Sequence, residues 1–193
     1  MQKINLFFIF IVIILLSSGG CSFFETRKPT SPDDDNVFFV PPTSADIVID
    51  NFLMAFNSKN IDNYYQCFLD SFSFIPSAEA NINYTGLFDN WKIQNERMYF
   101  LSLVNTIEKS NIMDLQLSNI KYETQTSDSV VLFADYSINL GLSEAQDTKY
   151  TGILSWTITL TNNGLWYISR WMDFHKETGT DKTFSDLKAK FHN

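Results

Sequence analysis

The stretch Leu165-Trp166-Tyr167-Ile168-Ser169-Arg170-Trp171-Met172-Asp173 decides the predicted fold, because its composition is that of a long β-strand. The turn signal Asn162-Asn163-Gly164 precedes it. Strict alternation would place Leu165, Tyr167, Ser169 and Trp171 on one face and Trp166, Ile168, Arg170 and Met172 on the other. Neither face is simply polar, so we expect this strand to lie inside a sheet with other groups packed on both sides.

Three further long strands are predicted before this one, at 113–124, 129–142 and 149–161. The second and third alternate cleanly between apolar and polar residues, which indicates one face toward the core and one toward water or a partner. In the first, the alternation slips near Asn119, which predicts a β-bulge. These segments predict an antiparallel meander that ends with the strand at 165–173.

Helical spacing of apolar residues predicts helices at about 44–57, 61–68 and 89–107, and a short final helix at about 184–191. A short strand is expected at 72–76, and residues 77–90 are predicted to form a polar, irregular loop. The predicted fold is therefore α+β, with three N-terminal helices packed on a strongly curved antiparallel sheet and a short C-terminal helix.

The first twenty residues have the pattern of a secretory signal peptide. A short basic start with Lys3 precedes an apolar run of about thirteen residues, 4–16, which is too short for a transmembrane helix. Small residues then lead directly to Cys21. Gly19-Gly20-Cys21 resembles a bacterial lipobox, although Ser18 stands where an aliphatic residue is usual. The resemblance implies cleavage before Cys21 and lipid attachment to its thiol, and the alternative is ordinary secretion with an unmodified cysteine.

We therefore expect a chain anchored in the bacterial cell envelope through lipidated Cys21. Ser22, rather than Asp, favours the outer membrane facing the periplasm, with surface exposure as the alternative. Four prolines and the run Asp33-Asp34-Asp35 predict a flexible tether over 21–43, which would span roughly 25 Å. The folded domain is predicted at 44–193.

Composition limits the classes of function. Aromatic residues make up 16% of the 193 residues, which is ample for a core, and the net charge is −8 without a basic stripe. Such an acidic chain is a poor nucleic-acid binder. Of the two cysteines, Cys67 lies in an aromatic helical patch and is expected to be a buried core residue. His175 and His192 lie far apart in the sequence, so no metal site, cofactor or catalytic triad is predicted.

The order of helices and strands resembles the nuclear-transport-factor-2-like fold, also called cystatin-like or polyketide-cyclase-like. The resemblance covers about residues 43–175 and rests on Tyr64-Tyr65, Trp91 with Glu96, and Trp166-Tyr167-Ile168 with Trp171 and Asp173. Within this fold the chain is similar to uncharacterised bacterial lipoproteins that pair the opening Phe24-Glu25-x-Arg27-x-Pro29 with a closing helix at 186–189. Members include isomerases, dehydratases, cyclases and binding modules, so the fold does not determine the function.

The resemblance implies a cavity between the helices and the concave face of the sheet. The residues expected to line a ligand site there are Trp91, Tyr99, Tyr136, Trp156, Tyr167, Trp171 and Asp173. The alternative for each aromatic residue is that it only fills the core. Asp114, Asp135, Glu96 and Asp173 are the acids near suitable places, but no pair of acids matches the base and donor of ketosteroid-isomerase-like enzymes, so no catalytic residue is assigned.

Three functions remain open at this point. The favoured one is a non-enzymatic module of the cell envelope that binds an apolar small molecule or a protein. The second is an isomerase, dehydratase or hydrolase that uses the same cavity and would need a carboxyl group with a raised pKa. The third is a structural subunit that meets an envelope protein, or a second copy of itself, through the outer face of the sheet.

Overall fold

A computed structural model describes residues 39–107, 111–141, 149–176 and 181–192. The chain divides into two units, Met1–Asn36 and Val37–Asn193, and the described residues belong to the second. The predicted signal peptide, Cys21 and most of the predicted tether lie outside the described residues. In the described part, no helix is both long and apolar enough to span a membrane.

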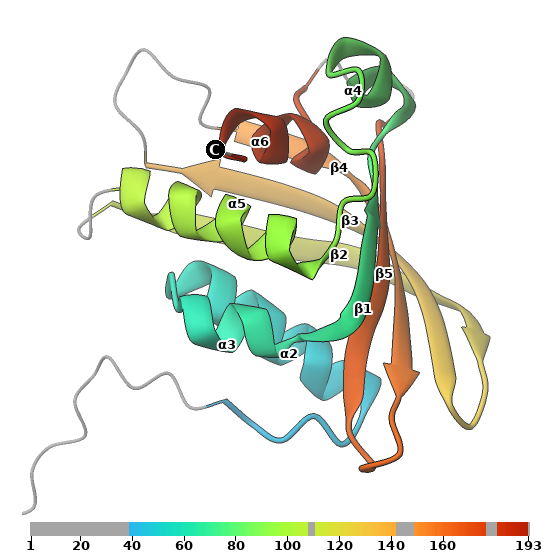
Figure 1. The fold of residues 1–193 in the computed structure, drawn as a ribbon. Helices are drawn as coiled ribbons and strands as arrows, with labels where there is room; N and C mark the ends of the chain where they lie inside the picture. Colours follow the sequence, from blue (N-terminus) through green and yellow to red (C-terminus); the bar gives the residue numbers. More distant parts are fainter. Residues whose placement is uncertain (1–38, 108–110, 142–148, 177–180, 193) are drawn as a thin grey trace, which may run out of the picture. The chain divides into compact units, whose positions relative to one another are not determined.

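Five strands form one strongly curved sheet (Figure 1). They are β1 (Phe68–Ile75), β2 (Met113–Gln125), β3 (Ser129–Leu140), β4 (Lys149–Leu160) and β5 (Trp166–Phe174). The order is β1-β5-β4-β3-β2, so β5 has a neighbour on each side, as its two mixed faces predict. Three pairs are antiparallel, whereas β1 lies parallel to β5. The α+β fold class is confirmed, with this one parallel pair added.

The strand register shifts at several places in the sheet, and two of these shifts bear on the predictions. The predicted slip in β2 is confirmed, because the register with β3 shifts between Ser118 and Lys121 and Asn119 has a φ of 52°. A second bulge lies in β5, where Thr157 pairs with Arg170 but the next residue, Ile158, pairs with Ile168. The extra residue, Ser169, puts Ile168 and Trp171 on the same buried face. The strict alternation expected along β5 is therefore wrong.

The helices are α2 (Ala45–Asn57), α3 (Ile61–Gln66), α4 (Ala78–Asn83), α5 (Ile93–Thr106) and α6 (Phe184–Lys190). The side chains of Ser44, Asn60 and Ser77 cap α2, α3 and α4 by accepting from backbone N–H groups. Helix α4 lies inside the segment expected to be an irregular loop. Helix α5 starts later than predicted because Asn90 has a φ of 58°, which a helix cannot contain.

The folded domain begins before residue 44. Phe39 packs against the core, and Val40 and Asn51 exchange two hydrogen bonds of 3.1 and 2.6 Å. The N–H of Trp166 also donates to the carbonyl of Pro42, at 2.8 Å. Residues 39–43, which the sequence predicts to be part of the tether, are thus attached to the domain through Asn51 and the start of β5.

Helix α6 lies across the inner face of the sheet, which carries the buried residues Leu132, Tyr136, Leu154, Trp156 and Trp171 (Figure 1). The ring of Phe184 meets the rings of Trp171 at 4.6 Å and Tyr136 at 4.7 Å between centroids. The space between this inner face and α2, α3, α5 and α6 is called the cone interior below. Its core is rich in aromatic side chains, as the composition predicts.

Candidate functional site

Six of the seven residues expected to line a ligand site are buried in the cone interior. They are Trp91, Tyr99, Tyr136, Trp156, Trp171 and Asp173. Tyr167 is half-buried and pairs with Thr159 on β4. The fold thus brings six of the predicted lining residues together. Their side chains contact other side chains of the same chain.

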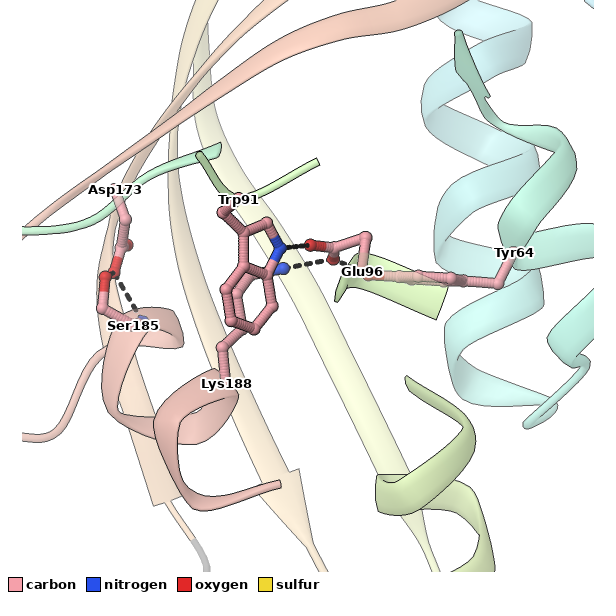
Figure 2. Close-up of polar contacts among 6 residues, drawn as sticks. All are labelled: Tyr64, Trp91, Glu96, Asp173, Ser185 and Lys188. Atoms are coloured by element: carbon pink, nitrogen blue, oxygen red, sulfur yellow. Dashed lines mark hydrogen bonds and ion pairs between the residues drawn. The ribbon is translucent and has the colours of Figure 1, made fainter. Parts of the chain in front are cut away.

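Asp173 is held at the end of β5 by neutral donors. Its Oδ1 accepts from the hydroxyl of Tyr136 at 2.8 Å. Its Oδ2 accepts from the N–H and the hydroxyl of Ser185 at 2.8 and 2.6 Å (Figure 2). The N–H of Phe184 donates to the Tyr136 hydroxyl at 2.7 Å. Burial raises the pKa of Asp173, although the bonds from Ser185 and Tyr136 act in the opposite direction. The first turn of α6 therefore docks on a buried carboxyl group.

Gly152 makes this arrangement sterically feasible. It lies opposite Tyr136 in the β3–β4 register, and a Cβ atom at this position would be 2.6 Å from Tyr136 Cζ and 2.7 Å from the carbonyl oxygen of Phe174. Both distances are below any normal van der Waals contact. A side chain at position 152 would displace the Tyr136 ring from its place beside Asp173.

Glu96, on α5, is the second fully buried acid of the cone interior. Its Oε1 accepts from the hydroxyl of Tyr64 at 2.7 Å and pairs with Lys188 of α6, and its Oε2 accepts from Trp91 Nε1 at 2.8 Å (Figure 2). Burial, followed by the charge of Glu96, raises the pKa of Tyr64, so its hydroxyl keeps the proton that it donates. Two neutral donors and one opposite charge compensate this carboxylate.

The ammonium group of Lys188 is surrounded by aromatic rings, called the lysine cage below. Nζ lies 4.2 Å from the ring centroid of Trp171, 4.6 Å from those of Phe74 and Tyr99, 5.8 Å from Phe184 and 5.9 Å from Trp91. All are within cation–π distance. Lys188 is 0% exposed, and this burial lowers its pKa to about 8 despite the nearby Glu96.

Three buried polar atoms have no hydrogen-bond partner among the described residues: Tyr99 Oη, Trp156 Nε1 and Trp171 Nε1. Tyr99 and Trp171 belong to the lysine cage, and the ring of Trp156 meets that of Trp171 at 5.5 Å. A buried donor without a partner costs about 1–3 kcal/mol. Such groups are rare in native proteins, and two of these three belong to the lysine cage.

A cavity of about 320 Å³ lies beside the cone interior, where β1 and β5 end. It is lined by Ile75, Pro76, Ala78, Asn81, Met172, Asp173 and Phe174. The lining is mainly apolar, with one carboxyl group and one amide. Asp173 therefore borders this cavity as well as the contact with α6.

The other groups considered from the sequence lie outside this cluster. Asp135 accepts from Asn119 and pairs with Lys176 at 3.4 Å, which together lower its pKa, and Asp114 accepts from Gln116. No three residues of metal-binding type come together within the described ranges. Cys67 is buried, as predicted, and burial raises the pKa of its thiol.

Sequence reasoning missed the roles of Lys188, Ser185 and Tyr64. Lys188 follows Phe184 by four positions and so falls on the apolar side of α6 with Leu187. That spacing was the available signal, but a lysine is expected to be solvated unless a partner is known. Glu96 was recognised as an acid near a suitable place, and its partner lies 92 positions away in the sequence.

No family model matches the sequence, and no curated protein matches it. Solved structures resemble the fold. A candidate aromatic ring hydroxylase from Novosphingobium aromaticivorans has a TM-score of 0.56 at 14% identity, covering 73% of this chain and 91% of that one. The β subunit of benzoate 1,2-dioxygenase from Burkholderia mallei has a TM-score of 0.54 at 11% identity, with coverage of 68% and 87%.

A third resemblance names the fold. A candidate dehydratase of the NTF2-like family from Streptomyces avermitilis has a TM-score of 0.51 at 10% identity, covering 68% of this chain and 92% of that one. Identities this low carry no activity across to this chain. Together with the curved five-stranded sheet and its helices, they establish that the chain has the nuclear-transport-factor-2-like fold.

Proposed function

We propose that the chain is a lipid-anchored, non-enzymatic binding module of the bacterial cell envelope. The observation that supports this most is that both fully buried acids of the cone interior are occupied by the chain's own donors. Glu96 pairs with Lys188, and Asp173 accepts from Tyr136 and Ser185. In both acids the carboxyl oxygens already accept from the chain's own groups, whereas a general acid or base must reach a substrate.

The membrane anchor is the lipid on Cys21. Each buried methylene of an acyl chain contributes about 0.8 kcal/mol, so two or more chains hold a protein on a membrane stably. The predicted placement is the outer membrane facing the periplasm. The folded domain would then stand off the membrane at the end of its tether.

Metabolic labelling with an alkyne-tagged fatty acid tests the anchor. We expect the full chain to take up the label and to sediment with membranes, and Cys21→Ala to lose the label. Cys67→Ala is the matched control, because the buried Cys67 thiol cannot be the attachment site. Label that persists in Cys21→Ala would refute lipidation at Cys21.

Native mass spectrometry of residues 37–193 tests the binding function. A mass excess of a few hundred daltons that is lost on activation supports a small ligand. A mass without adduct, together with a specific envelope protein or a second copy recovered by crosslinking, supports a protein partner. For the latter, the half-buried outer residues Phe133, Ile153, Met172 and Phe174 offer a sheet face. If neither an adduct nor a crosslinked partner is found, the result contradicts a binding module.

A second candidate function is an isomerase, dehydratase or hydrolase that acts on an apolar substrate. It is favoured by one observation, which is that Asp173 combines a raised pKa with a position at the 320 Å³ cavity. Carboxyl ¹³C NMR across a pH titration tests it. Ionisation of Asp173 within the ordinary range of aspartate would remove this candidate.

A further inference from the structure

We propose that the cone interior is a binding site for an alkylammonium group, which α6 of the same chain occupies through Lys188. This inference rests on the proposed binding function, because it names the class of ligand. Lys188 would act as a built-in competitor, and an external ammonium compound would take its place when α6 moves away.

The site has the chemistry that recognises an organic cation. Without α6, the rings of Phe74, Trp91, Tyr99 and Trp171 remain on β1, the segment before α5, α5 and β5. Aromatic faces attract cations through their quadrupole, and quaternary ammonium ligands are bound in such cages. Glu96 supplies the opposite charge, already oriented by the donors Tyr64 and Trp91.

The orientation of Glu96 does not depend on Lys188. Tyr64 comes from α3, and Trp91 comes from the segment before α5, so both donors stay in place if α6 leaves. A carboxylate held by two fixed donors inside four rings is a preorganised site, which lowers the cost of binding. The site is therefore assembled by the rest of the domain, and α6 only fills it.

The unpartnered donors around the cage also support a ligand site. Trp171 Nε1 cannot bond to Lys188, because both groups can only donate, and Tyr99 Oη also has no partner among the described residues while Lys188 is in place. A ligand that carries an oxygen near its ammonium group could accept from them. Lys188 thus satisfies the charge of the site and leaves its hydrogen-bonding capacity unused.

Replacing Lys188 by alanine tests the cage directly, since the missing atoms correspond to n-propylammonium. In the full chain, purified in a nonionic detergent, we expect n-propylammonium to bind Lys188→Ala about tenfold more tightly than 1-propanol, which has the same size and no charge. Lys190→Ala is the matched control, because Lys190 is exposed on the same helix and should show no preference. Equal affinity for both probes in a folded Lys188→Ala protein would overturn the proposal.

Hydrogen exchange on the unmodified full chain tests the competition and does not depend on the variant folding. We expect n-propylammonium chloride to accelerate exchange of the Leu187 and Phe191 amides about tenfold over sodium chloride of equal ionic strength. The Ile107 amide, which donates to Leu103 at the end of α5, should not respond. Unchanged exchange in α6 would overturn the proposal. Either failure removes the ligand class only, since lipid labelling and native mass spectrometry test the binding module separately.

Discussion

Glu96 and Asp173 are both buried under α6, but the groups that compensate them differ. Glu96 faces a full opposite charge from Lys188, whereas Asp173 faces only neutral donors from Tyr136 and Ser185. A buried ion pair depends strongly on both partners, because the loss of one leaves an uncompensated charge in the core. A carboxyl group among neutral donors can instead take up a proton. The first cluster is therefore expected to be the more sensitive to mutation and the second to pH.

The largest expected effect follows from breaking the ion pair. Lys188→Met keeps most of the side-chain volume but leaves Glu96 without its countercharge, and should lower the free energy of unfolding by about 3–5 kcal/mol. Adding Glu96→Gln should restore much of this loss, because the double variant has no buried charge at the site. Urea unfolding of the four proteins of this cycle measures the coupling. Purely additive losses would show that the two side chains do not interact.

Removing one donor from Glu96 should have an intermediate effect. Tyr64→Phe deletes the hydroxyl group that donates to Oε1 at 2.7 Å and leaves the ring stacked on Phe100, with centroids 3.7 Å apart. A hydrogen bond to a charged group contributes about 1.5–3 kcal/mol, which is the expected loss in urea unfolding. A variant as stable as the wild type would mean that Lys188 and Trp91 satisfy Glu96 without Tyr64.

Asp173→Asn sharpens the contrast between the clusters. It places an amide N–H₂ among donors, so we expect a loss of about 1–3 kcal/mol at neutral pH. The raised pKa of Asp173 means that the folded state binds its proton more tightly than the unfolded state. The wild type should therefore gain stability relative to Asp173→Asn as the pH falls from neutral toward about 4, the unfolded aspartate pKa. A difference that shrinks on acidification would contradict the raised pKa.

The smallest effect is expected at Tyr99. Its hydroxyl has no partner among the described residues, so Tyr99→Phe removes a buried polar group without breaking a hydrogen bond. The free energy of unfolding should change by less than about 0.5 kcal/mol or rise. Thermal unfolding of this variant beside Tyr64→Phe compares an unpaired hydroxyl with a paired one in the same core. A loss above 1 kcal/mol in Tyr99→Phe would show, by the same estimate, that the hydroxyl is bonded.

Local patterns predicted most of the elements. The alternation in β3 and β4, the slip near Asn119 and the final helix are all found, because each depends on neighbouring residues. The bulge at Ser169 in β5 was not predicted, because both faces of this strand carry large apolar residues. The sequence therefore shows no break in alternation at that position. Short-range signals were insufficient there.

The content of the site was harder to predict than the fold. Six of the seven predicted lining residues lie together, because the fold resemblance predicts which strand face and which helices enclose the interior. The space between them is filled by α6. This helix comes after the last strand in the sequence but packs back against the core. The partners of Glu96 and Asp173 on this helix, Lys188 and Ser185, carry no local signature of their contacts.

The proton chemical shifts of the Lys188 side chain, assigned by comparison with Lys188→Met, test most directly whether α6 fills the cone interior. With Nζ over the faces of Trp171, Phe74 and Tyr99, ring currents should move the ε-methylene protons clearly upfield of those of the other lysines. Shifts equal to those of the exposed Lys190 would contradict the account, because they would place Lys188 in water and leave the cage and Glu96 without it.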